Sequence, residues 1–338
     1  MKFDFVIGNP PYQEDTKNNG RQSPVYNLFM EEAYKVANVV ELITPARFLF
    51  NAGQTPKAWN DKMLNDKHFK VLSYESDARR VFSNTEIKGG VAITLRNSHK
   101  IYDEIGVFTE FENLNGILMK IKPYCKNSIS DICVRGVPYA YTETLKKDHP
   151  EYLELAGNSF DLRTNAFENL YDKIFFETAR TKNDVGIYGM YNKKRRKLFI
   201  NRKYLKVPDN FKGYKVILSK AQGSDKFGEA LSQIIIGEKN SGHTQTFFSM
   251  GCFETENEAL NLGKYLKTKF SRCMLSILKK TQDITPYKWK YVPLQNFAED
   301  SDIDWSKSVA EIDQQLYKKY GLTQEEIDFI ESNVKEME

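Results

Sequence analysis

The sequence has few cysteines and histidines, and none of them is arranged as a metal site. The four cysteines, Cys125, Cys133, Cys252 and Cys273, form no C-x-x-C pair. No two of the four histidines stand at the spacing of metal ligands. The sequence therefore predicts neither a zinc site nor a disulfide framework, and it fits a reducing cytoplasm best.

Long apolar segments and several catalytic signatures are absent as well. The longest apolar stretch, residues 36–50, is interrupted by Asn38, Glu41 and Arg47, so no membrane-spanning segment is expected. There is no glycine-rich phosphate loop with a lysine and no G-x-S-x-G turn. These absences argue against an ATPase and against a hydrolase with a nucleophilic serine at such a turn.

The composition is that of a mildly basic globular protein. The 338 residues include 49 lysines and arginines against 45 aspartates and glutamates, which gives a net charge of +4. This charge permits an anionic partner without requiring one. A chain of this length can bury more than one core, so we expect two domains and a tail.

The pattern of predicted elements changes at about residue 122. Before it, apolar runs alternate with helical spacing, which is typical of an α/β sheet; strands are expected at 3–7, 39–43, 69–74 and 90–95. After it, short β-like runs are mixed with helices expected at 166–178 and 256–280. The last part, from residue 305, is acidic and helical. We therefore expect domains at 1–122 and 123–298, and a helical tail at 299–338.

The motif Asn9-Pro10-Pro11-Tyr12 follows residues 3–7, an apolar run that we expect to form a buried strand. It is the most specific chemical signal in the sequence. The lone pair of an exocyclic amine is delocalised into its ring. Transfer of a methyl group to that amine therefore requires hydrogen-bond acceptors for the two amino hydrogens, which make the lone pair available. The Asn9 amide oxygen and the Pro10 carbonyl are suited to this role, and the two prolines stiffen the turn. Tyr12 can stack on a base that has left the duplex.

These residues resemble the catalytic motif of the amino-group DNA methyltransferases. The run Phe3-Asp-Phe-Val-Ile-Gly-Asn-Pro-Pro-Tyr is similar to N6-adenine enzymes of type II restriction–modification systems with a C-terminal recognition domain. Residues 25–33 and 41–49 resemble the helix and the strand that follow the motif in that family. Residues 80–93 resemble a later motif in which an aromatic residue packs against the flipped adenine, and Phe82 is the matching position.

The resemblance extends to the family's target-recognition domain through residues 214–224, 246–280 and 291–294. It implies an α/β fold: the C-terminal part of a Rossmann-like methyltransferase sheet, then a mixed α+β DNA-recognition domain and a helical tail. It also implies S-adenosylmethionine as cofactor and double-stranded DNA as partner. Methylases of this kind are often fused to a restriction nuclease, which makes such a nuclease a further candidate partner.

The family's cofactor-binding loop has no clear match in the sequence. Ser249-Met-Gly-Cys-Phe-Glu is the nearest candidate, and it has a single glycine. We therefore expect a methyltransferase that needs a cofactor-binding N-terminal half and is inactive as an isolated chain. Phe3, Phe5 and Ile7 would lie on an open sheet edge that pairs with that half or with a second copy.

The densest basic run, residues 193–197, is the candidate for contact with the DNA backbone. Its members are Lys193, Lys194, Arg195, Arg196 and Lys197, and Lys220 is added from the recognition-like segment. A solvated loop between strands is the alternative for the basic run. For the whole chain, the alternative to an adenine methyltransferase is a non-catalytic DNA-binding or specificity component in which the motif is idle.

Overall fold

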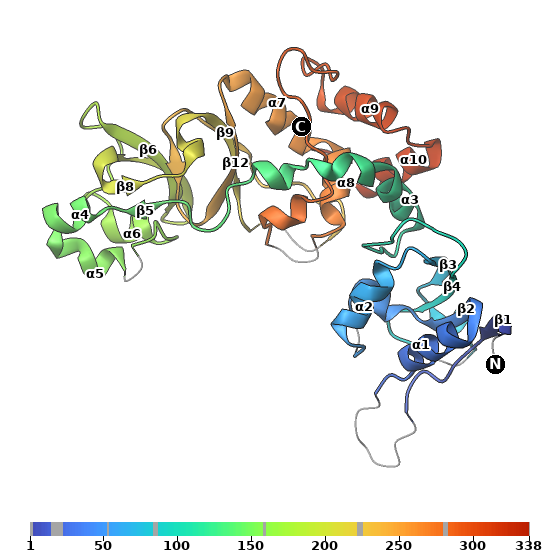
Figure 1. Cartoon of the computed structure of the whole chain (residues 1–338). Helices are drawn as coiled ribbons and strands as arrows, with labels where there is room; N and C mark the ends of the chain where they lie inside the picture. The colour runs from blue at the N-terminus through green and yellow to red at the C-terminus, as the bar shows by residue number, and fades with distance from the viewer. Residues whose placement is uncertain are drawn as a thin grey trace. The chain divides into compact units, whose positions relative to one another are not determined.

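The computed structural model describes residues 3–14, 23–52, 54–83, 87–157, 160–221, 226–279 and 283–337. The chain divides into two compact units, Met1–Asn115 and Gly116–Glu338 (Figure 1). Both contain helices and strands, and the described strands form several sheets, so the fold is mixed α/β. Among the described helices, none combines the length and apolar character that a bilayer crossing requires.

The first unit is built on one sheet with the strand order β1-β2-β4-β3. Strands β1 and β2 are parallel, and β4 runs antiparallel to both of its neighbours. The elements of this unit are β1 (Phe3–Gly8), α1 (Tyr26–Val36), β2 (Ala37–Pro45), η1 (Ala46–Phe50), α2 (Lys57–Leu64), β3 (Phe69–Glu75), η2 (Ala78–Arg80) and β4 (Val91–Asn97). All four strands expected from the sequence are present.

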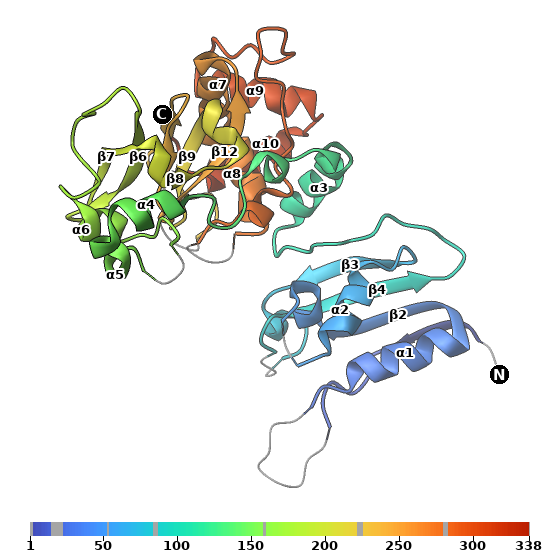
Figure 2. The same ribbon diagram turned by 60° about the vertical axis from the view of Figure 1, so that its left-hand side comes forward.

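Helices α1 and α2 pack on one face of this sheet (Figure 2). Tyr26 and Met30 of α1 join Trp59 and Met63 of α2 in a buried core that includes Phe69 of β3. The core is rich in aromatic rings, and Phe48 lies 5.1 Å from Trp59 between ring centroids. Burial of such rings removes a large apolar area from water and holds the helices on the sheet.

The first strand lies at the edge of the sheet, as expected, but it is not buried. Its side chains alternate, so Val6 packs against the core while Phe3, Phe5 and Ile7 point to the other face. These three are 50%, 66% and 77% exposed. The expectation of a buried strand was therefore wrong, because an apolar run shows strand propensity but does not show which of its faces is covered.

The second unit contains the remaining elements, and helix α3 (Glu112–Ile121) spans the division between the units. The strands are β5 (Ala140–Tyr141), β6 (Asp184–Tyr191), β7 (Lys194–Asn201), β8 (Leu205–Lys206), β9 (Tyr214–Ser219), β10 (Ile235–Gly237), β11 (Gly242–His243) and β12 (Phe247–Phe253). The helices are α4 (Glu143–Asp148), α5 (Leu153–Ala156), α6 (Ala166–Leu170), α7 (Glu256–Lys267), α8 (Lys269–Ser276), α9 (Val309–Lys319) and α10 (Gln324–Asn333). Short 3-10 helices are η3 (Lys122–Lys126), η4 (Ile129–Ile132), η5 (Pro150–Tyr152), η6 (Arg202–Tyr204), η7 (Asp209–Lys212) and η8 (Pro286–Trp289).

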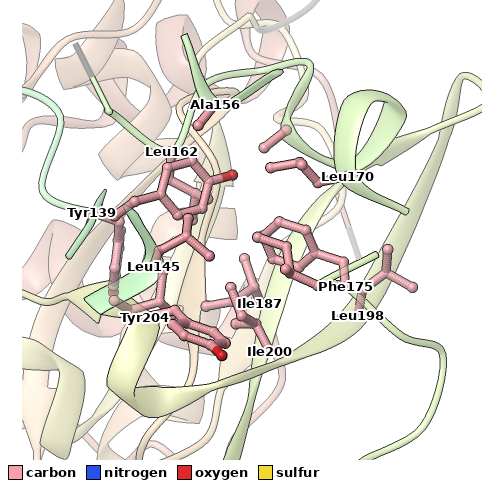
Figure 3. Packing of buried hydrophobic residues seen from close by; sticks show 14 of the residues in the cluster. Tyr139, Leu145, Ala156, Leu162, Leu170, Phe175, Ile187, Leu198, Ile200 and Tyr204 are labelled. Carbon is pink, nitrogen blue, oxygen red and sulfur yellow. The ribbon is translucent and has the colours of Figure 1, made fainter. Parts of the chain in front are cut away.

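A core in this unit lies beside the antiparallel pair β6–β7 (Figure 3). Ile187, Leu198 and Ile200 from the two strands pack against Leu170 and Phe175. Helix α6 ends at Leu170, eight residues earlier than expected, since Asp172 adopts a left-handed conformation with φ 54° and Phe176 bridges to Phe199 of β7. The aromatic residues of 171–178 thus serve the strand core and not a helix.

The other expected helix, residues 256–280, is divided at Thr268. The Thr268 hydroxyl accepts a hydrogen bond from the Ser271 amide and begins α8. The Asp313 carboxylate of α9 also accepts from the amides of Lys269 and Phe270, at 2.9 and 2.8 Å. The helices of the predicted tail are thereby part of the second unit, and the division at 122 and 298 stays a prediction about functional domains.

Lys215 is a buried cation at the centre of the sheet β10-β9-β12. Its ammonium donates to the main-chain carbonyls of Phe211, Glu238 and Ser241 at 3.1, 3.2 and 3.0 Å. Burial lowers the pKa of Lys215 to about 8. The three carbonyls compensate for much of the water that the ammonium has lost.

Candidate functional site

The motif directly follows the carboxyl end of β1 and contains Asn9, Pro10 and Tyr12. The parallel pairing of β1 and β2, with Gly8 opposite Leu42, places this end beside the end of β2. Asn9 is exposed, and its side-chain amide makes no hydrogen bond with the residues that the structure describes. Its oxygen is therefore available to an external amino group.

Tyr12 is held by contacts on both sides of the motif. Its hydroxyl donates to the carbonyl of Ile43 on β2 at 3.5 Å, and its carbonyl accepts from the Val25 amide at 3.1 Å. Partial burial raises the pKa of Tyr12 to about 12, so the hydroxyl stays protonated and neutral at physiological pH. Tyr12 therefore presents a fixed aromatic ring beside Asn9.

The structure brings Phe82 to Tyr12, although 69 residues separate them in the chain. The two ring centroids lie 6.4 Å apart with an interplanar angle of 68°, an edge-to-face arrangement. Phe82 follows η2. The N-cap of this 3-10 helix is Asp77, whose carboxylate accepts a hydrogen bond from the Arg79 amide. Two of the aromatic positions singled out in the sequence thus lie together at the end of β1.

Two glycines fix the course of the chain after Phe82. Gly89 and Gly90 have φ values of +87° and +75°. A Cβ on Gly90 would lie 2.2 Å from the Glu75 carbonyl oxygen and 2.8 Å from Cα of Ser76. The Gly90 carbonyl accepts from the Ala46 amide at 3.0 Å. Only glycine allows the Phe82 segment to return so closely over the ends of β2 and β3.

Gly90→Ala is therefore expected to destabilise the protein by about 2–5 kcal/mol, since left-handed strain adds to a main-chain overlap. Urea unfolding followed by circular dichroism measures the change. Gly136→Ala is the matched control, because Gly136 has φ +73° but no atom within 4 Å of its would-be Cβ. Its cost should be about 1 kcal/mol; equal losses in the two variants would show that the close approach is unimportant.

The basic run lies at a hairpin and along β7, not in a loop. Asn192 and Lys193 both have positive φ, 49° and 60°, and form the tight turn between β6 and β7. Lys194 and Arg196 are exposed and project from the same face of β7. Neither they nor Lys193 forms an ion pair with the described part of the chain.

The other two cations of the run point to the opposite face and are bound there. Lys197 pairs with Glu238, with its ammonium 2.8 Å from both carboxylate oxygens. Arg195 donates to the Gln233 carbonyl at 3.0 Å and lies over the ring of Phe247. The structure thus separates five neighbouring cations into exposed and internally bound groups.

Lys220 does not join the run. It continues β9, its amide donates to the Thr246 carbonyl at 3.0 Å, and its carbonyl accepts from the Ile284 amide at 2.7 Å. Burial lowers the pKa of Lys220. Lys220 thus lies on a different part of this unit's sheet system from the β6–β7 turn.

Sequence reasoning did not single out a groove next to β6–β7 with a volume of about 450 Å³. It is lined by Lys182, Arg202 and Lys239 together with the paired Lys197 and Glu238. These residues come from three separated segments, so no local pattern in the sequence could have indicated them. The groove has mixed charge, and Lys239 is itself paired with Glu254 at 3.1 Å.

Residues 1–82 match the family model of the Eco57I restriction-modification methylase. This segment includes the first sheet strands, the motif at residues 9–12 and Phe82. The resemblance of this part of the chain to a restriction–modification methylase, inferred from the sequence, is thereby confirmed.

An uncharacterized adenine-specific methylase of Mycoplasma pneumoniae is 30% identical over 95 residues. The match covers 27% of this chain and 22% of that relative.

Two solved structures give weak overall similarity. The type IIG restriction endonuclease BpuSI aligns with a TM-score of 0.31 and 10% identity, covering 98% of this chain and 54% of that chain. The type IIL restriction-modification enzyme MmeI, in complex with DNA, aligns with a TM-score of 0.33 and 10% identity, covering 98% and 56%. The chain therefore spans about half the length of these two enzymes.

Proposed function

We propose that the chain is the adenine-activating and DNA-recognising part of an N6-adenine-specific DNA methyltransferase of a restriction–modification system. The observation that carries the proposal is the edge-to-face contact of Tyr12 with Phe82, three residues along the chain from the exposed side chain of Asn9. The first unit, in this proposal, is the C-terminal part of a Rossmann-like sheet. The match of residues 1–82 to a methylase family supports it.

The proposed chemistry depends on acceptors at the end of β1. A flipped adenine enters beside Tyr12, and its amino group donates to the Asn9 amide oxygen and the Pro10 carbonyl. These two bonds favour the state in which the nitrogen lone pair is available to an electrophile. Tyr12 and Phe82 present aromatic surface to the base, which replaces the stacking lost in the duplex.

The methyl donor implied by the resemblance is S-adenosylmethionine, which needs hydrogen-bonding partners for its amino-acid end, its ribose and its adenine. Beside the motif, β1 presents the exposed apolar side chains of Phe3, Phe5 and Ile7. These side chains do not supply such partners, so the residues around Asn9 alone do not fit the donor. We assign its binding to other residues, and a calorimetric titration of the purified chain with S-adenosylmethionine tests this assignment.

The exposed edge of the first unit's sheet supports the proposal that β1 pairs with another polypeptide. Among the described strands β1 pairs only with β2, and its outward face is apolar. A cofactor-binding polypeptide or a second copy would pair with this edge in the proposal. A monodisperse monomer in light scattering, with full methyl transfer, would contradict it.

The second unit contacts the DNA backbone through the exposed cations at the β6–β7 turn, in the proposal. Lys194 and Arg196 have no competing carboxylate within the described residues, whereas Lys197 is paired with Glu238. Each phosphate contact releases counterions and steepens the salt dependence of binding.

Lys194→Gln combined with Arg196→Gln is therefore expected to lower the slope of log affinity against log salt by about two. Fluorescence anisotropy of a labelled mixed-sequence duplex at several salt concentrations measures it. Lys197→Gln removes the same type of charge from the same strand and should change the slope much less. A larger effect of Lys197→Gln would reverse our assignment of the two faces.

The second candidate function is a DNA-binding component with an idle motif. It is favoured by the match to the adenine-specific methylase, which covers only 22% of that relative. Asn9→Ala in the gene in its own host, followed by single-molecule sequencing of N6-methyladenine, separates the two, because a component with an idle motif would tolerate this change. Loss of methylation at a defined DNA sequence is expected. Unchanged methylation alongside DNA binding by the purified chain would favour the non-catalytic component.

A further inference from the structure

Arg47 lies at the same sheet edge as the proposed adenine site. It follows β2 in η1, and β2 is the parallel neighbour of the strand that leads into Asn9. Tyr12 reaches over the end of β2 to the carbonyl of Ile43, four residues before Arg47. The sequence places Arg47 in the segment 41–49, which resembles the strand after the motif, but it indicates no function for this side chain.

The Phe82 segment also returns to Arg47. The amide before Arg47, that of Ala46, donates to the Gly90 carbonyl. At Gly89 a Cβ would lie 2.6 Å from Cγ of Arg47, so the aliphatic part of the arginine packs against the glycine backbone. Arg47 thus contacts the segment that follows Phe82, and Tyr12 contacts β2 four residues before Arg47.

The guanidinium of Arg47 has no counter-charge within the described part of the chain. It takes part in no hydrogen bond, ion pair or ring contact there, and it is partly buried. The nearby carboxylates of Asp77 and Glu75 are paired with Arg79 and Arg80, at 2.8 and 3.6 Å. A partly desolvated arginine without a partner is costly unless an external anion completes it.

We infer that Arg47 binds a phosphodiester of the DNA strand that carries the target adenine. This inference rests on the proposed function and adds a positioning residue to it. The planar guanidinium can bind two phosphate oxygens at once, which fixes the backbone as well as attracting it. Held there, the nucleotide is placed so that its base lies between Asn9 and the Tyr12 and Phe82 rings.

The test is a salt titration of duplex binding by the full chain, with anisotropy of a labelled mixed-sequence duplex. Arg47→Gln should lower the salt slope by about one and weaken binding about tenfold at moderate salt. Arg47→Lys keeps the charge and much of the aliphatic packing, so it should keep the slope but lose part of the affinity. Thermal melting of each variant shows whether it is folded.

Arg79→Gln is the matched control, since Arg79 lies in the same unit and is paired with Asp77. It should leave the slope nearly unchanged. An unchanged slope in Arg47→Gln, with wild-type binding intact, overturns the Arg47 assignment and leaves the proposed function standing. Absence of duplex binding by the wild-type chain overturns both.

The second source of a matching anion is the carboxylate of S-adenosylmethionine. Calorimetry with S-adenosylmethionine alone separates the two sources. Loss of its binding in Arg47→Gln, with an unchanged salt slope, would assign the arginine to the cofactor and overturn the inference. Equal binding of S-adenosylmethionine by wild type and Arg47→Gln, or no binding by either, together with the lower salt slope, supports the phosphate.

Discussion

Replacement of Asn9 by alanine in the host gene should lower N6-methyladenine at the recognised sites about a hundredfold or more. The Asn9 amide oxygen stabilises the amino group of the target adenine in the geometry that accepts the methyl group. Removal of a comparable preorganised hydrogen-bonding group commonly lowers the rate about a hundredfold or more. The purified Asn9→Ala chain should bind duplex DNA within about threefold of wild type, because one exposed neutral side chain adds little to backbone contact. Sequencing of methylated bases and anisotropy measure the two effects.

Gln13→Ala is the matched control for this substitution. Gln13 also has an exposed amide side chain, it lies just beyond the motif, and its main-chain bridge to Pro24 survives the change. Methylation should stay near the wild-type level. Parallel loss of DNA binding and methylation in Asn9→Ala would show that Asn9 supports the fold or the DNA contact and not the amine.

Acidification from pH 7 to pH 4 should cost about 3 kcal/mol of stability through His243 alone. His243 is fully buried between the Thr244 carbonyl and the Ser249 hydroxyl, at 3.0 and 3.1 Å. Burial lowers its pKa from 6.5 to about 4, and the cations of Lys220 and Lys215 add to the effect. Between these values the unfolded chain binds a proton that the folded chain excludes, so stability falls as the pH falls.

His243→Asn removes this titration and is compared with wild type by urea unfolding at pH 7 and pH 4.5. The variant is less stable at both values, but its loss of stability between them should be smaller by about 2.4 kcal/mol. The difference between the two proteins cancels carboxylates that titrate in the same range, such as Asp313, whose pKa is raised to about 6 by burial. Identical losses would show that His243 is not neutral and buried in solution.

The sequence predicted helices, strands and motifs better than it predicted which other parts of the protein pack against them. Strands such as 69–74 and the helical region after Glu256 were found because their periodicity is local, but the division of that region at Thr268 was not predicted. The exposure of Phe5 depends on which layers cover the sheet, and the end of α6 depends on Asp172 and on a bridge to Phe199. Neither can be read from a local pattern.

The candidate site shows the same limit. Asn9, Tyr12 and Phe82 could be named from motifs. The distance between the Tyr12 and Phe82 rings could not be predicted, since it depends on how the chain between them folds. The basic run stays a prediction of DNA contact. The alternation of side chains along β7 places Arg196 and the paired Lys197 on opposite faces, which the sequence did not predict. Arg47 could not be recognised, because the lack of a counter-charge among the described residues around it depends on the folded structure.

The buried ammonium of Lys215 restricts how this protein can change during evolution. One side chain on β9 holds carbonyls from η7 and from the segment 238–241, so these parts cannot change length independently. Insertions and deletions in homologues that keep this lysine should avoid residues 211–215 and 238–241. Homologues that replace Lys215 should show altered lengths in both segments together. Changes in DNA-sequence specificity among homologues that keep it should occur in other loops.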